Sequence, residues 1–155
     1  MEPRRRFDSP EQEAYLGLWR TYDRLRALED ELFSWHDLTS QQYNALRLLR
    51  AAHPKTIRTL DLAGRLVSRA PDITRLLDAL AKRSLVTRER PATNRREVHI
   101  RIAPAGIALL DVLREPLRKC HERQLGHLNR KQLRELSKLL QAARLPHEPA
   151  DSSWR

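Results

Sequence analysis

Arginine side chains gather around a short polar break in the middle of the chain. Five of them lie between residues 88 and 101: Arg88, Arg90, Arg95, Arg96 and Arg101. A guanidinium is permanently charged and presents a planar set of N–H donors, so it is suited to binding phosphates and guanine edges. Residues 54–101 carry 12 basic and 5 acidic side chains, a net charge of +7, within a formal total of +10. A basic patch of this density attracts polyanions, and the first candidate chemistry is therefore nucleic-acid binding.

The histidine, cysteine and acidic residues do not have the spacing of a catalytic site or a metal site. No two histidines lie four apart on one predicted helix, and Cys120, His121 and Glu122 are adjacent, so they diverge around a helix. The sequence has no phosphate-binding loop, nucleophile elbow or paired-carboxylate motif. We therefore expect no enzyme, no metal site and no cofactor. Cys120 is the only cysteine, which leaves a redox sensor or a partly buried small residue, and its place in a long helix favours the second.

The arginines lie where the hydrophobic period changes from that of a helix to that of a strand. Val98, Ile100 and Ile102 alternate with polar residues, which is typical of a half-buried strand. Residues 86–90 can pair with this strand across the polar break at 91–94. The pattern predicts a two-stranded antiparallel ribbon with a basic tip.

Helices precede and follow this ribbon. Apolar residues recur every three or four positions over 10–33, 40–52, 57–66 and from about 71 to 82. Capping residues support three helix starts: Ser9 for the first helix, Thr39 with Gln42 for the second, and Asn129 with Gln132 for the last. In the third helix we expect Leu60, Leu62, Ala63 and Leu66 to be buried. The fourth helix has Ser68 or Ala70 as its expected cap, and a long helix is predicted over 104–128.

Three consecutive helices followed by a ribbon is the order of a winged helix-turn-helix. In that arrangement the third helix enters the DNA major groove and the ribbon reaches the backbone or the minor groove. On this interpretation Arg75 contacts a guanine edge, Thr74 a phosphate or a thymine methyl, and Arg69 a phosphate. The alternative is that Arg75 and Arg96 are only solvated, or are paired with nearby acids such as Asp78 and Glu97.

Residues 38–106 resemble the multiple antibiotic resistance regulator (MarR) family of transcription factors. The resemblance rests on LTSQQYNALRLLR, LDLAGRL and RAPDITRLLDALAKRSLVTRERPATNRREVHIRIAPAG. It implies a mainly α fold with a small two-stranded β wing, in which the winged helix-turn-helix lobe (38–103) is flanked by dimerisation helices (9–36 and 104–145). We expect residues 146–155 to be a disordered tail. The implied protein is a homodimeric, ligand-responsive repressor that binds a pseudo-palindromic double-stranded DNA operator.

The expected DNA-binding residues lie on the fourth helix, just before it, and on the ribbon. They are Arg69, Asp72, Thr74, Arg75, Arg88, Arg90, Thr93, Asn94, Arg95 and Arg96. Two positions depart from the pattern of the family. Asn94 stands where an aspartate commonly precedes the wing arginines, and Ser84 stands where a glycine commonly follows the fourth helix, a place that suits a left-handed residue.

The resemblance also implies a cleft for a small aromatic or lipophilic effector between the dimerisation region and the winged lobe. Aromatic residues and one histidine of the first two helices are candidates to line it: Tyr15, Trp19, Tyr22, Trp35, His36 and Tyr43. For each of them, core packing or a place in the dimer interface is the alternative.

Two other functions stay open from the sequence. One is a nonspecific nucleic-acid or nucleoid binder, and the other is a helical protein-interaction module in which the basic patch is incidental. The N-terminus has no apolar run after its arginines and no segment is long enough to span a membrane. We therefore expect a cytoplasmic protein.

Overall fold

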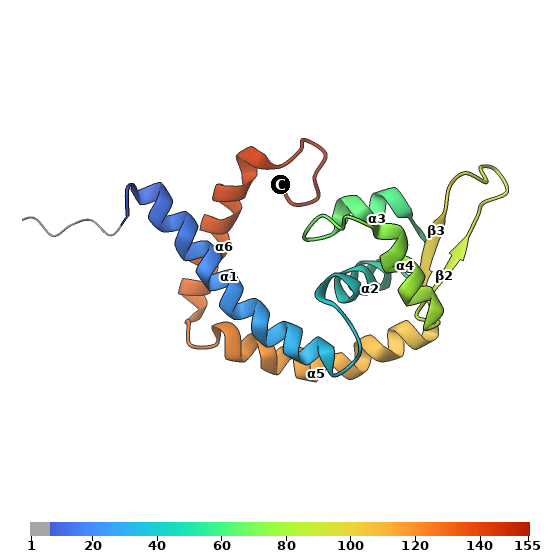
Figure 1. Ribbon diagram of the computed structural model, residues 1–155, viewed down its shortest axis with the longest axis horizontal. Helices are drawn as coiled ribbons and strands as arrows, with labels where there is room; N and C mark the ends of the chain where they lie inside the picture. The colour runs from blue at the N-terminus through green and yellow to red at the C-terminus, as the bar shows by residue number, and fades with distance from the viewer. Residues whose placement is uncertain (1–6) are drawn as a thin grey trace, which may run out of the picture.

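The computed structural model describes residues 7–155, so the expectation about the N-terminus falls largely on residues outside this range. The described chain forms a winged lobe at one end and a set of long terminal helices at the other (Figure 1). In chain order the elements are α1 (Pro10–Ser34), α2 (Ser40–Ala52), β1 (Ile57–Arg58), α3 (Thr59–Arg65), α4 (Ile73–Lys82), β2 (Val86–Glu89), β3 (His99–Ile102), α5 (Pro104–Leu125), α6 (Arg130–Arg144) and the 3₁₀ turn η1 (Leu145–His147). The mainly α fold class with a winged lobe is confirmed.

The capping residues predicted for three helices are confirmed. The Ser9 hydroxyl accepts a hydrogen bond from the Gln12 amide at 3.1 Å. Thr39 and Gln42 exchange two hydrogen bonds, at 3.1 and 3.0 Å, and form a capping box. Asn129 and Gln132 do the same at 2.9 Å each. These bonds satisfy amide groups that the first turn of a helix leaves without partners.

The sheet has three strands, whereas the sequence predicted two. The strand order is β1-β3-β2 and both pairings are antiparallel. Ile57 is buried opposite Ile100, which draws residues 57 and 58 into the sheet. The third helix therefore begins at Thr59 and not at residue 57. Leu60, which we expected to be buried, is 82% exposed, because two residues along a helix it lies on the face opposite the buried Leu62.

Both ends of α4 differ in detail from the prediction. The cap is Asp72, whose carboxylate accepts a hydrogen bond from the Arg75 amide at 2.9 Å; Ser68 and Ala70 do not cap the helix. At the other end Ser84 adopts a left-handed conformation with φ of 58°. The Leu85 amide bonds to the Leu80 carbonyl at 3.0 Å and the Ser84 amide to the Ala81 carbonyl at 2.9 Å. This is a Schellman motif, formed here without the usual glycine.

The hydrophobic core lies inside the winged lobe and extends to the first half of α5. Leu46 and Leu49 of α2, Leu80 of α4, Ile100 of β3 and Leu113 of α5 are all fully buried. Gly106 lies where the first turn of α5 approaches the Leu85 carbonyl and the Ile102 side chain, and a Cβ atom there would clash with both. The glycine thus allows α5 to dock closely on the sheet.

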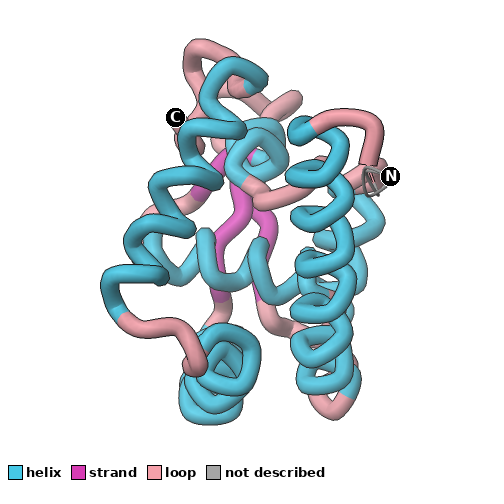
Figure 2. The backbone as a smooth tube through the Cα atoms, turned by 90° about the vertical axis from the view of Figure 1, so that its left-hand side faces the viewer, coloured by secondary structure: helices cyan, strands magenta, loops and turns pink. Residues whose placement is uncertain are grey.

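The terminal helices form a more open arrangement. α1 packs against α5 and slants across it, as Figures 1 and 2 show, and the Gln124 side chain donates to the Leu25 carbonyl at 2.8 Å. α5 ends at Leu125 and not at residue 128, since a turn begins at Gly126. None of the residues of α6, all of which are described, is buried.

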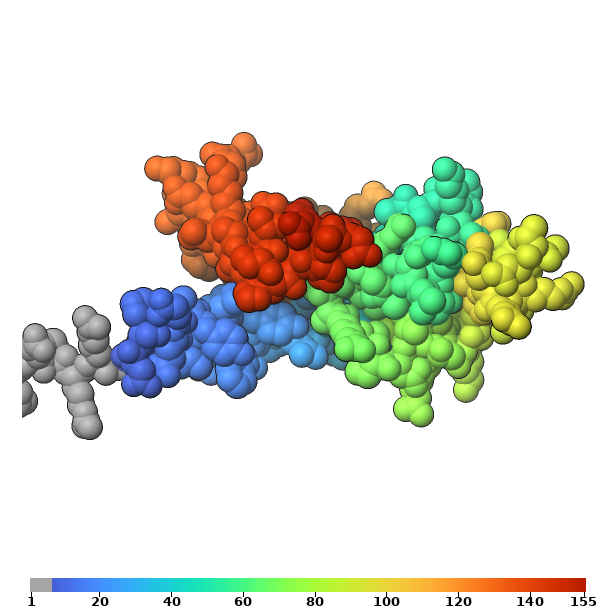
Figure 3. Space-filling view, turned by 90° about the horizontal axis from the view of Figure 1, so that it is seen from above, coloured from blue at the N-terminus to red at the C-terminus, as the bar shows by residue number. Residues whose placement is uncertain are grey.

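Residues 146–155 are folded back on α6 and are not the disordered tail that we predicted. The Arg144 guanidinium lies 5.4 Å from the centre of the Trp154 ring and donates to the Trp154 carbonyl at 3.2 and 3.3 Å. The Trp154 indole N–H lies 3.4 Å from the Arg65 carbonyl at the end of α3. In Figure 3 the red C-terminal segment accordingly meets the green part of the winged lobe. The segment was predicted to be disordered because its composition is polar, but the contacts of one aromatic residue, Trp154, hold it in place.

Candidate nucleic-acid interface

The exposed face of α4 presents the residues predicted to read DNA bases. Leu77 and Leu80 face the core, which turns Thr74 and Arg75 to solvent on the first turn of the helix. The Arg75 side chain is 88% exposed, and its closest carboxylate is that of Asp72, at 3.9 Å. Because the Asp72 carboxylate caps the helix, its role in the structure is to hold the Arg75 backbone. Arg69 is exposed in the loop before α4.

A groove of about 950 Å³ separates α3 and α4 from the wing. Four arginines line it: Arg58, Arg88, Arg90 and Arg96. Thr59, Leu60 and Thr74 line the helical side, and Glu89, Glu97 and Val98 the wing side. The predicted base-reading helix and the predicted wing contacts thus face one concave surface, whose charged lining residues are these four arginines and three acids, Asp61, Glu89 and Glu97.

The wing arginines divide into two groups. Arg88 forms an ion pair with Asp78 on α4, and Arg90 donates to the Arg95 carbonyl at 2.9 Å, so these two guanidinium groups hold the wing in place. Arg95 and Arg96, in contrast, form no ion pair with any described residue and lie exposed at the tip. Arg90 likewise forms no ion pair with a described residue, so these three wing arginines have charge available for a phosphate.

Asn94 and Thr93 complete the tip. The Asn94 side chain accepts a hydrogen bond from the Arg96 amide at 3.1 Å and so shapes the turn; Thr93 is exposed beside it. Neither Arg75 nor Arg96 pairs with Asp78 or Glu97, the acids considered for them above, because Arg88 and Arg58 occupy those carboxylates.

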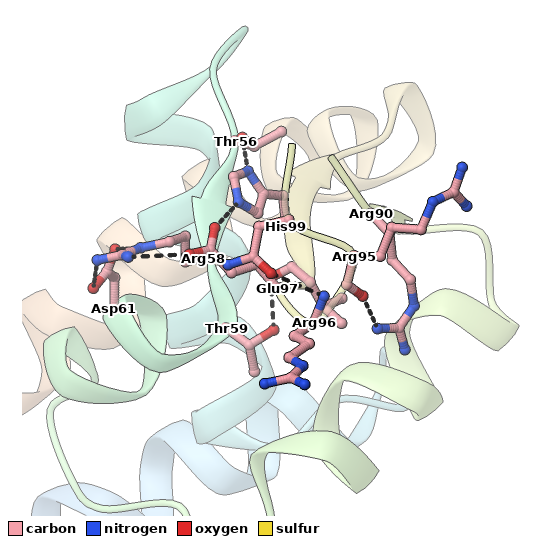
Figure 4. A network of polar contacts seen from close by, with 11 residues as sticks. Thr56, Arg58, Thr59, Asp61, Arg90, Arg95, Arg96, Glu97 and His99 are labelled. Carbon is pink, nitrogen blue, oxygen red and sulfur yellow. Dashed lines mark hydrogen bonds and ion pairs between the residues drawn. The ribbon is translucent and has the colours of Figure 1, made fainter. Parts of the chain in front are cut away.

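A polar network at the base of the wing was missed from the sequence (Figure 4). Arg58 lies 2.8 Å from one Asp61 oxygen and 3.6 Å from Glu97. His99, one of the polar residues that alternate with Val98, Ile100 and Ile102, is half-buried, with Nε2 2.9 Å from Glu97 and Nδ1 3.2 Å from Thr56. The hydrogen bond with His99 and the nearby Arg58 lower the pKa of Glu97. No signal marked this network, since it depends on the pairing of the two-residue strand β1 with β3.

A second missed contact links the lobe to the terminal helices. Arg83, which follows α4, donates to the Asp37 carbonyl at 2.7 Å and to the His36 carbonyl at 3.1 Å. Both carbonyls belong to the turn between α1 and α2, where Asp37 has a φ of 52°. The end of α4 is therefore tied to the turn that follows α1.

The six predicted effector residues do not converge on one cavity. Tyr15, Trp19 and Tyr22 lie exposed on α1; Tyr43 stacks on Phe33 with ring centres 4.8 Å apart. His36 is half-buried in the turn after α1. Trp35 alone lines a cleft, one of about 440 Å³ between α1 and α5, formed by Leu28, Glu31, Leu32, Glu115, Pro116, Lys119, Cys120 and Arg123. Cys120 is buried there, and burial raises the pKa of its thiol.

The described part of the chain contains no group of three or more His, Cys, Asp or Glu side chains placed to hold a metal ion. None of the helices in residues 7–155 is both long and apolar enough to cross a membrane.

Comparison with known proteins identifies one family repeatedly. The MarR family model matches residues 38–98. A MarR transcription factor from Planctomyces limnophilus is 56% identical, with a TM-score of 0.71, and the match covers 88% of this chain and 99% of that one. No protein with a curated function matches the chain at a significant level.

Two more distant structures share the fold. A mutant MarR from E. coli in complex with operator DNA is 22% identical, with a TM-score of 0.73 over 81% of this chain and 89% of that one. The regulator BpsR from Bordetella bronchiseptica, whose DNA binding is regulated by 6-hydroxynicotinic acid, is 20% identical, with a TM-score of 0.76 over 91% and 96%.

Proposed function

Because this chain belongs to the MarR family of transcription regulators, we propose that it is a homodimeric repressor that binds a pseudo-palindromic operator in double-stranded DNA. Each protomer supplies α4 to a major groove and its wing to the adjacent backbone or minor groove. Two half-sites about one helical turn apart match the two lobes of the dimer.

The observation that carries the proposal is the position of exposed cations with weak or no acid partners: Arg95 and Arg96 form no ion pair with a described residue, and Arg75 has only Asp72, at 3.9 Å. Arg96 of the wing lines the groove opposite Thr74 of α4, and Arg75, the next residue of that helix, is exposed, as are Arg69 and Arg95. Most of the other basic side chains around the groove are neutralised within the protein: Arg58 by Asp61 and Glu97, and Arg88 by Asp78. If the basic residues served only to keep the protein soluble, there would be no reason for some arginines to be paired with acids and others to be left unpaired at this surface.

The exposed apolar side chains of the terminal helices support the homodimer. Trp19 is 61% exposed, and Tyr15, Leu18 and Tyr22 are exposed beside it on α1. α6 is amphipathic, yet none of its residues is buried and Leu139 is 68% exposed. Contiguous apolar surface of this kind marks a protein interface, and a second copy of these helices supplies a matching apolar face.

The cleft between α1 and α5 supports a small aromatic acid as the effector. Leu28, Leu32 and Trp35 form its apolar wall, while Lys119 and Arg123 provide cations for a carboxylate. Of the six effector residues predicted from the sequence, this proposal retains Trp35. A ligand here would contact α1. Because Arg83 joins the turn after α1 to the end of α4, a shift of α1 would also move α4.

Selection of bound fragments from the organism's genomic DNA, followed by affinity measurement, tests the DNA-binding proposal. Arg75→Ala is expected to cost about 1–3 kcal/mol of binding free energy and to relax sequence preference. Arg95→Ala is expected to weaken binding to all sequences alike and to flatten the salt dependence. Equal enrichment of unrelated fragments would instead favour a nonspecific nucleoid binder, and no enrichment a protein-interaction module.

The effector proposal is tested by titrating aromatic carboxylates into the protein–DNA complex. We expect an acid that fills the cleft to quench Trp35 fluorescence and release the DNA at the same concentrations. Lys119→Gln with Arg123→Gln is the control in which both effects disappear. Release without dependence on these two residues would place the effector elsewhere.

A further inference from the structure

The loop of the wing has little backbone pairing to hold it. The ladder between β2 and β3 ends at the pair Glu89 and His99, and β1 reaches no farther along β3 than Arg58 opposite His99. Beyond that, residues 91–97 are shaped by two turn hydrogen bonds, Asn94 to Pro91 at 3.1 Å and Glu97 to Asn94 at 3.2 Å. Side chains must therefore set the direction in which this loop leaves the sheet.

Glu97 stands at the point where the loop rejoins the sheet, and its carboxylate is held from two sides. Arg58 approaches from β1 at 3.6 Å, and His99 approaches from the neighbouring position of the wing at 2.9 Å. Arg58 is itself fixed by two hydrogen bonds to Asp61 on α3, at 2.8 and 3.1 Å. One residue later, Thr59 binds the Val98 carbonyl through its amide at 3.0 Å and its hydroxyl at 3.1 Å. The base of the wing is thereby tied to the start of α3.

Arg96 immediately precedes Glu97, and its side chain turns toward the helices and lines the groove (Figure 4). Its backbone amide is held by Asn94, but its guanidinium has no acid partner among the described residues. The direction of the Arg96 side chain therefore depends on the backbone around it. The contacts of Glu97 hold that backbone in place.

We propose that Glu97 is a positioning residue for DNA binding: its carboxylate, clamped by Arg58 and His99, holds the wing so that Arg96 meets the DNA backbone. The inference rests on the proposed function. It assigns a binding role to an acidic residue inside a basic groove, where Coulomb repulsion alone would weaken the attraction for DNA.

This conflict of signs gives a sharp test. Simple electrostatics predicts that Glu97→Gln, which removes a negative charge, tightens DNA binding. The positioning role predicts that it weakens operator binding by about tenfold, as loss of a good phosphate contact in each half of a dimer would. It also predicts a log–log salt slope less steep by about 2, since each lost phosphate contact removes about 0.9. Fluorescence anisotropy at several salt concentrations measures both quantities.

Glu89→Gln is the matched control. Glu89 lines the same groove, and its one ion pair, to Arg101 at 3.6 Å, joins strands already held by the ladder. We expect this variant to bind DNA as well as the parent protein or more tightly. Arg96→Gln should lower the affinity and the salt slope as Glu97→Gln does, and the double variant should show no further loss.

Three results would overturn the inference. Glu97→Gln could tighten binding as Glu89→Gln does; its effect could add fully to that of Arg96→Gln; or the affinity could fall with an unchanged salt slope, which indicates a smaller folded fraction. If the parent protein binds no duplex at all, the proposed function fails and this inference falls with it. A parent that binds DNA and a Glu97→Gln variant that loses nothing overturn this inference alone.

Discussion

The winged lobe and the terminal helices differ in how completely a single chain buries their apolar side chains. In the lobe, Leu46, Leu49, Leu80 and Ile100 are fully buried, and the large exposed apolar residues are Leu60 and Val67. On α1 a continuous set of apolar residues is exposed instead: Tyr15, Leu16, Leu18, Trp19 and Tyr22. The lobe thus buries its apolar side chains within one chain, whereas the terminal helices expose apolar surface that the proposed dimer would cover.

The polar residues of the two regions differ in the same way. In the lobe several ion pairs join separate elements, such as Arg88 with Asp78 and Arg58 with Glu97. On α5 and α6 the ion pairs mostly join residues three or four apart on one helix, such as Arg118 with Glu115 and Lys131 with Glu135. Pairs of the second kind stabilise a helix slightly but do not fix where it packs. The ion pairs of the terminal helices therefore contribute little to where these helices pack.

The largest expected effect lies in the core of the lobe. Leu80→Ala removes a fully buried side chain from α4 and should lower the free energy of unfolding by about 3 kcal/mol. Urea denaturation followed by circular dichroism measures the loss. A change below about 1 kcal/mol would mean that the core of the lobe is not packed as described.

The next effect concerns the terminal helices. Trp19→Ala should weaken dimerisation by about 2 kcal/mol, because large aromatic residues dominate interfaces of this kind. Sedimentation velocity over a range of protein concentrations measures the dimer dissociation constant. Val67→Ala, which alters an equally exposed apolar residue on the lobe, is the control that should leave the constant unchanged. If the two variants changed the dimer dissociation constant equally, the exposed apolar residues of the terminal helices would not differ in function from those of the lobe.

The cap of α4 provides a smaller effect. Asp72→Ala should destabilise the lobe by about 1 kcal/mol, since the Arg75 amide loses its acceptor. Asp72→Asn keeps an acceptor oxygen and should preserve both stability and sequence preference. Loss of sequence preference in Asp72→Asn, measured on matched and mismatched duplexes, would show that this residue contacts bases after all.

The smallest effect is a gain in stability. Ser84 holds a left-handed conformation, which glycine adopts without strain. Ser84→Gly should therefore raise the free energy of unfolding by up to about 1 kcal/mol. Thermal denaturation checks the direction, and a lower melting temperature would mean that the Ser84 side chain contributes more than its backbone strain costs.

Local patterns in the sequence predicted much of this structure, for identifiable reasons. Capping boxes depend on residues three apart, so Thr39 with Gln42 and Asn129 with Gln132 could be identified from the sequence alone. The alternation at Val98, Ile100 and Ile102 predicted β3. Strand β1 was missed because two residues are too few to show a period of two, and its pairing with β3 depends on chain folding.

In the candidate site, too, features that depend on single residues were predicted, and contacts between distant segments were not. Residue type and position were enough to place Arg75, Arg95 and Arg96 on an exposed basic surface. They were not enough to assign Arg88 to Asp78 or Arg58 to Glu97, because those pairs join segments that the sequence separates. Asp72 was predicted as a DNA contact; the structure shows that its carboxylate also caps α4, a role that the sequence analysis assigned to Ser68 or Ala70.

Fluorescence anisotropy with a genomically selected duplex and a shuffled duplex, at several salt concentrations, tests the central claim most directly. Specific binding by the two winged lobes predicts at least about a thousandfold preference for the selected duplex. It also predicts a log–log salt slope of about −5 to −8, from six to nine neutralised phosphates per dimer. Equal affinity for both duplexes, or no binding at low salt, would contradict the claim that this basic groove reads DNA.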